Sequence, residues 1–98
     1  MKVVWIMHDI VLTDEIQALL DELEIVGFSR WKRMTGRGPL SGTRMDSHVW
    51  PGANSGTATV LDAATAARLM ERLQELRDRI GKQNGIWAFT TPVLDVLK

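Results

Sequence analysis

Residues 56–81 read GTATVLDAATAARLMERLQELRDRIG, and they contain the clearest transition from a strand to a helix in the chain. β-Branched residues are frequent up to Leu61, as expected of a strand. Asp62 then stands where a helix N-cap belongs. Behind it, apolar residues recur at steps of four, three and four, which places them on one helix face: Leu69, Leu73, Leu76 and Ile80. Because Gly81 suits the position that ends a helix, the segment predicts a strand over 56–61 and a helix ending near Ile80.

The rest of the chain indicates three further strands and one more helix. Residues 2–8 are rich in β-branched and aromatic types, which favours a buried strand. Thr13 is the expected N-cap of the first helix, and Gly27 is expected to end that element. The apolar face of this helix is expected at Ile16, Leu19, Leu20 and Leu23. Strands are predicted over 28–35 and 86–91.

The order β-α-β-β-α-β predicts an α+β protein with the ferredoxin-like split fold. We expect one antiparallel four-stranded sheet with two helices on one face, in a single domain over residues 1–98. The other sheet face has no expected cover within one chain. Aromatic side chains should line it, drawn from Trp5, Trp31, Trp50, Trp87 and Phe89. Burial of this face between the sheets of neighbouring subunits is the simplest explanation for four tryptophans in a chain without tyrosine.

Composition excludes several classes of protein. The chain has 98 residues, and its 12 Lys and Arg balance 12 Asp and Glu. A nucleic-acid coat would show a basic excess, so no nucleic-acid partner is expected. Cysteine is absent, which excludes disulfide frameworks and thiolate chemistry. No apolar stretch reaches the 18 residues that a membrane span needs, so we expect no membrane insertion and a cytoplasmic location.

No combination of a nucleophile with a base stands out, so an enzyme is not expected. A divalent-metal site built from His8, Asp46 and His48 is conceivable, because imidazole and carboxylate suit first-row metal ions. The alternative is that both imidazoles are solvated or hydrogen-bonded for structural reasons.

Basic residues and glycines gather in the middle of the chain. Between Gly27 and Met45 there is no acid, and the five basic residues are Arg30, Lys32, Arg33, Arg37 and Arg44. A G-x-G-x-x-x-G run over 36–42 lies directly after the second predicted strand. Glycines let the backbone approach a ligand, and successive N–H groups can bind an anion. A plain flexible loop explains the run equally well, and ion pairs to the acids of residues 14–24 explain the basic strand.

Nearly the whole chain resembles the PII signalling protein family. The opening Met1-Lys2 with Leu12-x-Asp14-x-Ile16 is similar to that family's first strand and helix start. The Gly36-x-Gly38-x-x-x-Gly42 run resembles the base of its long T-loop. The segment over 87–96, WAFTTPVLDV, is similar to its fourth strand and the Pro-Val continuation.

This resemblance implies a homotrimer whose intersubunit clefts bind ATP, ADP or AMP. It implies that Met7 contacts the base or ribose, that the backbone near Arg37 meets the nucleotide, and that Lys98 reaches phosphate from the adjoining subunit. The glycines of that backbone are Gly36, Gly38 and Gly42. The family is not enzymatic: the small-molecule effector sets the conformation of a loop, which then binds a transporter, an enzyme or another protein target.

The chain also departs from the family pattern. The loop is shorter than a full T-loop, and Leu40 occupies the place of the family's loop glutamine. The glycine-rich phosphate turn is reduced to residues 82–85, KQNG. ATP and 2-oxoglutarate sensing in the family's usual manner is therefore not expected, and the expected ligand is a smaller nucleotide or an unrelated molecule.

Residues 43–56 are expected to form the loop that meets a protein target. Its candidate contacts are Arg44, His48, Trp50 and Asn54. An aromatic ring can stack on a base or seat a partner's side chain, while Trp50 buried in its own trimer interface is the alternative. A second hypothesis is a divalent-metal-responsive trimer similar to the CutA proteins, with His8, Asp46 and His48 as ligands. A third is a structural trimer without a ligand.

Overall fold

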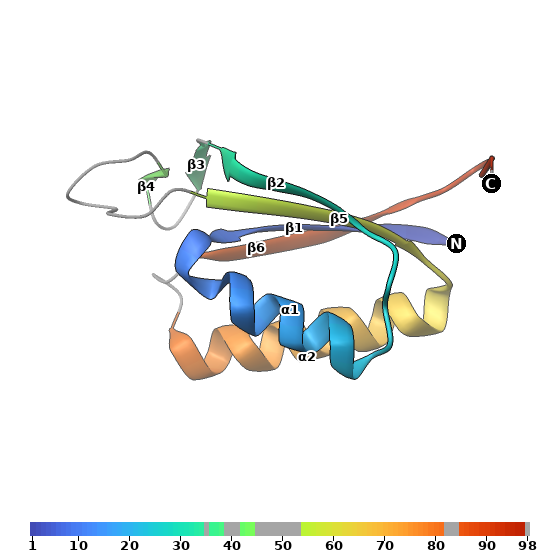
Figure 1. The fold of residues 1–98 in the computed structure, drawn as a ribbon, viewed down its shortest axis with the longest axis horizontal. Coiled ribbons are helices and arrows are strands. Elements are labelled where there is room, and N and C mark those ends of the chain that lie inside the picture. Colours follow the sequence, from blue (N-terminus) through green and yellow to red (C-terminus); the bar gives the residue numbers. More distant parts are fainter. Residues whose placement is uncertain (35, 39–41, 45–53, 82–84, 98) are drawn as a thin grey trace.

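The computed structural model describes residues 1–34, 36–38, 42–44, 54–81 and 85–97. Its larger sheet contains β1 (Lys2–Asp9), β2 (Ser29–Met34), β5 (Asn54–Leu61) and β6 (Ile86–Pro92), in the order β2-β5-β1-β6 with antiparallel neighbours. Two helices, α1 (Thr13–Glu22) and α2 (Ala63–Ile80), lie together on one side of it (Figure 1). This is the α+β, ferredoxin-like arrangement that the sequence predicts.

The hydrophobic core lies between the sheet and the two helices. Val4 and Ile6 of β1 point into it and are fully buried, as are Ile16, Leu20 and Leu69 of the helices. Burial of an aliphatic side chain of this size contributes about 1.5–3 kcal/mol to folding. Among the described residues, the helix-facing side of the sheet is therefore covered by α1 and α2 of the same chain. Neither described helix combines the length and the apolar character that a membrane-spanning helix needs.

The start of α1 differs from the prediction. A short 3₁₀ helix, η1 (Ile10–Leu12), precedes it, and the Asp9 carboxylate caps this helix by accepting a hydrogen bond of 3.1 Å from the Val11 amide. Thr13 is the first residue of α1, and its hydroxyl donates to the Ile10 carbonyl at 2.7 Å. The prediction that Thr13 is the N-cap is wrong, because its hydroxyl already bonds backward and Asp9 opens the helical segment.

The end of α1 also comes earlier than Gly27. The helix ends at Glu22, and Glu24 adopts a φ of 59°, in the left-handed region that few residues other than glycine visit. An irregular connection then leads to β2, which begins at Ser29.

Both ends of α2 match the prediction. The Asp62 side chain caps the helix by accepting hydrogen bonds from the Thr65 amide at 2.8 Å and the Thr65 hydroxyl at 2.9 Å. These bonds lower the pKa of the Asp62 carboxyl. Gly81 ends the helix with a φ of 92°, a value that side chains disfavour.

The central segment is partly described. β3 (Gly36–Gly38) and β4 (Gly42–Arg44) pair with each other as a small antiparallel ladder, here called the glycine hairpin. β5 begins at Asn54, two residues before the predicted start of the third strand. The loop expected over 43–56 is therefore bounded by strand residues at both ends, and its residues 45–53 lie outside the described part of the chain.

Candidate functional site

Aromatic side chains line the sheet face opposite the helices. In the register of β1, Trp5 lies across from Phe89 of β6, and Met7 lies across from Trp87. Because partners directly opposite each other share a sheet face, these side chains stand on one side while Val4 and Ile6 stand on the other. Trp5 and Phe89 stack at 6.2 Å between ring centroids, and Trp87 meets Phe89 at 5.3 Å. Trp87 is 57% exposed, so no described element covers this face there.

The same face continues across β5 to β2. Gly56 lies opposite Met7 on one side and opposite Trp31 on the other. Trp31 and Met34 lie close over Gly56: a Cβ built there would come 2.8 Å from the Met34 Sδ and 3.4 Å from Trp31 Cε3. The predicted aromatic face is thus present in Trp5, Trp31, Trp87 and Phe89, while Trp50 lies outside the described residues.

The glycine hairpin and Met7 lie at the same end of the sheet. Met34, near the hairpin, is registered with Asn54, which is registered in turn with Asp9 at the end of β1. Met7 is two residues back along that strand, on the open face. Figure 1 shows β3 and β4 at this end, beyond β2 and β5. The fold therefore places the backbones of several predicted site residues at one end of the sheet. These residues are Met7, Gly36, Arg37, Gly38, Gly42 and Arg44.

The structure gives no position for most of the other predicted site residues. Lys98, His48, Trp50 and Asp46 lie outside the described residues, so their predicted roles stay predictions. Asn54, expected in the loop, belongs to β5 and is only 7% exposed.

His8 lies on the other side of the sheet from Met7. Its side chain is fully buried, and its Nδ1 lies 2.8 Å from the Asp9 carbonyl oxygen. A carbonyl can only accept, so Nδ1 carries the proton, and Nε2 has no partner among the described residues. Burial lowers the pKa of His8 below its usual 6.5; the bond to Asp9 opposes this shift, and the charge of Arg30 adds to it.

This environment bears on the metal hypothesis. The described residues contain no group of three or more His, Cys, Asp or Glu placed to hold a metal ion. Asp46 and His48 are not among them, so the proposed ligand set remains a prediction. The alternative, that the imidazole is hydrogen-bonded for structural reasons, agrees with the environment of His8, because His8 is buried and bonds to the Asp9 carbonyl.

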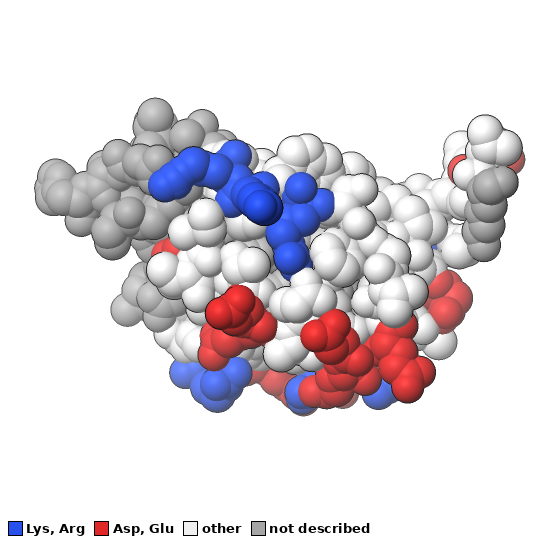
Figure 2. Space-filling view, viewed as in Figure 1, with Lys and Arg blue, Asp and Glu red and all other residues white. Residues whose placement is uncertain are grey.

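The basic strand and the acidic helix form two adjacent zones on one face of the molecule. Figure 2 shows Lys and Arg gathered along β2, which contains Arg30, Lys32 and Arg33, and acids along the helix layer below it. Arg30 does not pair with an acid of α1 in the bonds that the structure shows. Its Nη2 donates to Gln17 Oε1 at 2.8 Å, and its guanidinium lies 4.8 Å from the centre of the Phe28 ring.

Two acids of α1, Glu15 and Glu22, instead make ion pairs with α2. Glu22 accepts from Arg72 at 2.7 Å, and Glu15 lies 3.8 Å from Arg79. All four side chains are substantially exposed to water, so these ion pairs contribute little to stability. One alternative was that the cations of β2 form ion pairs with the acids of α1. The contacts of Arg30, Glu15 and Glu22 show other partners.

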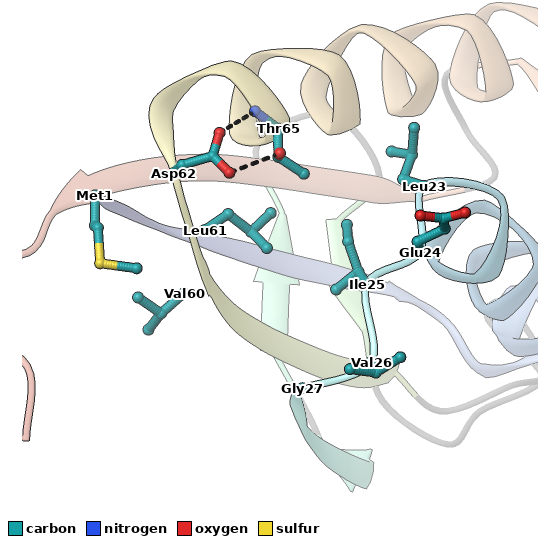
Figure 3. Close-up of a pocket in the computed structure, with 10 residues that line it drawn as sticks. All are labelled: Met1, Leu23, Glu24, Ile25, Val26, Gly27, Val60, Leu61, Asp62 and Thr65. Atoms are coloured by element: carbon teal, nitrogen blue, oxygen red, sulfur yellow. Dashed lines mark hydrogen bonds between the residues drawn. The ribbon is translucent and has the colours of Figure 1, made fainter. Parts of the chain in front are cut away.

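A hollow that the sequence analysis missed lies at the far end of the sheet from the glycine hairpin (Figure 3). Its volume is ≈ 400 Å³. It is bordered by the connection between α1 and β2, the end of β5, the start of α2 and the first residue of the chain: Leu23, Glu24, Ile25, Val26, Gly27, Val60, Leu61, Asp62, Thr65 and Met1. The available signal was the isolated apolar pair Ile25-Val26 between a helix end and a glycine, which no periodic pattern explains.

The residue types at the hairpin end are ones that can bind an anionic ligand. Glycine backbone can approach a ligand closely, Arg37 and Arg44 bring positive charge, and Met7 brings an adaptable apolar contact. These features suit an anion attached to a planar apolar group.

Comparison with known proteins adds the fold family. No protein-family model matches the chain, and no curated protein matches it. Among solved structures, the chain is similar to CPII from Thiomonas intermedia K12, a nitrogen regulatory PII-like protein bound to ADP, AMP and bicarbonate. The TM-score is 0.73 and the sequence identity is 16%, and the match covers 92% of this chain and 82% of that chain.

Two further solved structures agree. A putative PII-like signalling protein from Thermus thermophilus has a TM-score of 0.64 and 23% identity, over 92% of this chain and 83% of its own. A DUF3240 family protein from Shewanella baltica has a TM-score of 0.69 and 20% identity, over 99% and 93%. The chain therefore has the PII-like fold, which confirms the fold that the sequence resemblance implied.

Proposed function

We propose that this chain is a non-enzymatic regulatory protein of the PII-like kind. In this proposal it forms a homotrimer, binds an adenine nucleotide between subunits, and presents the segment between β4 and β5 to a protein target. The nucleotide is ADP or AMP rather than ATP held in the family's usual manner, because Leu40 and the short turn over 82–85 depart from the family pattern. The cytoplasmic location expected from the sequence belongs to the same proposal.

The observation that carries the proposal is the common position of the glycine hairpin and Met7 at one end of an uncovered aromatic face. Trp31 and Trp87 expose large apolar surfaces on that face, and exposed apolar patches of this kind commonly mark protein–protein contacts. Burial against neighbouring copies would also supplement the thin core of a chain of 98 residues. The cleft between copies would then adjoin the hairpin.

Nucleotide binding draws support from the chemistry of the hairpin and from CPII, whose structure contains ADP, AMP and bicarbonate. Successive glycine N–H groups can surround phosphate oxygens. In the proposal, the backbone of Gly36, Arg37, Gly38 and Gly42 contacts the phosphates, Met7 contacts the base or ribose, and Lys98 comes from the adjoining subunit.

The proposed mechanism is a shift between conformations of the loop. A ligand changes that equilibrium only as far as it binds one conformation better than the other. Because the glycine hairpin lies immediately before the loop, phosphate contacts there favour the loop conformation that fits the hairpin. Arg44, His48, Trp50 and Asn54 are the proposed contacts to the target, a transporter or an enzyme.

Native mass spectrometry with ATP, ADP, AMP and cyclic AMP tests this proposal. We expect a trimer that gains one nucleotide mass per subunit. The variant Gly38→Val should remove this binding and keep the trimer, because a side chain would then stand where the backbone must approach the ligand. Gly27→Val is the matched control, since nothing lies within 4 Å of a Cβ at Gly27. A monomer would contradict the proposed assembly. Nucleotide binding that survives in Gly38→Val would contradict the proposed site.

A further inference from the structure

Three buried polar side-chain atoms on the helix-facing side of the sheet have no hydrogen-bond partner among the described residues. They are His8 Nε2 on β1, Thr57 Oγ1 on β5 and Arg30 Nε on β2. His8 is 0% exposed and Thr57 is 1% exposed. Buried polar groups in native proteins nearly always bond to another protein group or to an ordered water. Three such atoms on adjacent strands therefore call for a common partner.

The register of the strands places these three residues next to one another. Thr57 lies across from Arg30 on one side, and on the other side across from Ile6, two residues before His8. Because Ile6 points into the core, all three share the helix-facing side, where Figure 1 shows α1 and α2. Direct and diagonal neighbours on one sheet face lie within about 8 Å, which long and aromatic side chains can span. The charge of Arg30 lowers the pKa of His8, which agrees with this proximity.

The three atoms have complementary hydrogen-bonding roles. Since His8 Nδ1 donates to the Asp9 carbonyl at 2.8 Å, its Nε2 retains a lone pair and can only accept. Arg30 Nε has one N–H and can only donate, whereas the Thr57 hydroxyl can do both. The guanidinium is held in place from the other side, because its Nη2 donates to Gln17 Oε1 of α1 at 2.8 Å.

These roles select the kind of ligand that can bind between the three atoms. A cation would face the positive charge of Arg30, and an anion without a proton could not donate to the lone pair of His8 Nε2. A water molecule is neutral, donates and accepts, and in protein interiors typically makes about three hydrogen bonds to otherwise unpartnered polar groups. Water therefore suits an acceptor, a donor and a hydroxyl at the same time.

We infer that His8 Nε2, Thr57 Oγ1 and Arg30 Nε bind one buried water molecule, which bridges β1, β5 and β2. The water donates to His8, accepts from Arg30 and pairs with the Thr57 hydroxyl. This bridge joins the end of β1 to the strand that leads to the glycine hairpin, and Arg30 extends it to α1 through Gln17. The site lies within one chain, so it depends on neither the trimer nor the nucleotide of the proposed function.

A high-resolution crystal structure of the unmodified protein tests the site directly. We expect one ordered water within about 2.7–3.2 Å of all three atoms. Long-range proton–nitrogen NMR spectra at about pH 8, where the imidazole is neutral, should show the proton of His8 on Nδ1, and His48→Gln identifies the signals of the other histidine. A direct bond from the Thr57 hydroxyl to His8 Nε2, a proton on Nε2, or three atoms without a water between them would overturn the inference.

Paired variants test whether the three residues share a partner in solution. Thr57→Val removes one hydroxyl from the proposed site. Thr59→Val is the matched control, because Thr59 lies two residues further along the same face of β5, is 2% exposed, and donates directly to the Gly27 carbonyl at 2.7 Å. Each variant is combined with His8→Leu, and urea unfolding is measured at one protein concentration.

Residues that share a hydrogen-bonded partner have effects that do not combine independently. For Thr57→Val with His8→Leu, we expect the unfolding equilibrium constant to change roughly tenfold less than the product of the two single effects. For Thr59→Val with His8→Leu, we expect the product itself. Equal coupling in both pairs, or coupling in neither, would overturn the shared site. His8→Met takes the place of His8→Leu if the leucine variant does not fold, and the crystal structure needs no variant.

Discussion

The two faces of the four-stranded sheet differ in how far one chain completes them. The helix-facing side buries Val4 and Ile6 of β1 against α1 and α2. The opposite side carries Trp31 and Trp87 with about half of each side chain exposed, at 48% and 57%. Both faces come from the same strands, and alternate residues of β1 serve one or the other. The strands are therefore under two sets of constraints, one from folding and one from the contact proposed between copies.

This comparison separates residues that support the fold from those proposed to support assembly. A substitution on the covered face should destabilise the chain at any protein concentration. A substitution on the open face should act mainly through association, so its effect should depend on concentration.

The largest expected effect is that of Leu69→Ala on the covered face. Leu69 is fully buried in the core, and removal of a buried leucine side chain costs about 2–5 kcal/mol. Trp87→Ala is the contrasting variant: it should weaken association by about 2 kcal/mol, roughly thirtyfold in Kd, if Trp87 is a central contact between copies. Denaturant unfolding at several protein concentrations measures the first, and sedimentation equilibrium measures the second.

The contrast would fail in either of two ways. Trp87→Ala could lower stability equally at all concentrations, which would assign Trp87 to the fold of one chain. Alternatively, its association could equal that of the unmodified protein, and the open face would then not be the contact between copies.

A smaller effect is expected from Gly56→Ala in β5. The new Cβ would lie 2.8 Å from Met34 Sδ and 3.4 Å from Trp31 Cε3, so Met34 must move. A methionine side chain adapts readily, and we expect a loss near the lower end of the overpacking range, about 1 kcal/mol. Gly27→Ala is the matched control, because a Cβ there meets nothing within 4 Å. Urea unfolding of both variants checks this, and equal stabilities would show that the Trp31 and Met34 contacts place no constraint on Gly56.

The smallest expected effect is a dependence of stability on pH through His8 of the covered face. Burial lowers the pKa of His8 below 6.5 in the folded chain. As the pH falls, His8 therefore binds a proton in the unfolded chain before it does so in the folded chain. The free energy of unfolding decreases from about pH 6.5 down to the lowered pKa of folded His8. Below that pKa, His8 causes no further change in stability. We expect His8→Leu to remove this slope between about pH 7 and the onset of carboxylate titration. Thermal unfolding across that range measures it, and an unchanged slope in His8→Leu would exclude His8 as its source.

Helix α2 and the order of helices and strands along the chain were predictable because their signals are local. The spacing of Leu69, Leu73 and Leu76 depends on helical geometry alone, and Asp62 and Gly81 have conformational preferences that act within a few residues. The start of α1 was not predictable in the same way. Thr13 and Asp9 are both good capping residues, and which of them caps depends on where β1 ends in the assembled sheet.

The candidate site was predictable in part for the same reason. The glycine run over 36–42 is visible in the sequence, and in the structure β3 and β4 pair as a hairpin over its ends. That Met7 lies at the hairpin's end of the sheet, on the face away from His8, follows from the register of β1 with β5. In the tertiary structure Arg30 bonds to Gln17, whereas Glu15 and Glu22 of α1 bond to α2.

The sequence by itself determined the element order, the amphipathic helices and the aromatic content of the strands, since these follow from the period of apolar residues and from local backbone preferences. Only the tertiary structure decided which side chains share a face, how His8 is buried, and that β2 leaves β5 beyond Ser29 to create the hollow. The physical reason is that these features arise from contacts between residues distant in sequence, whose register is set when the sheet and helices pack as a whole.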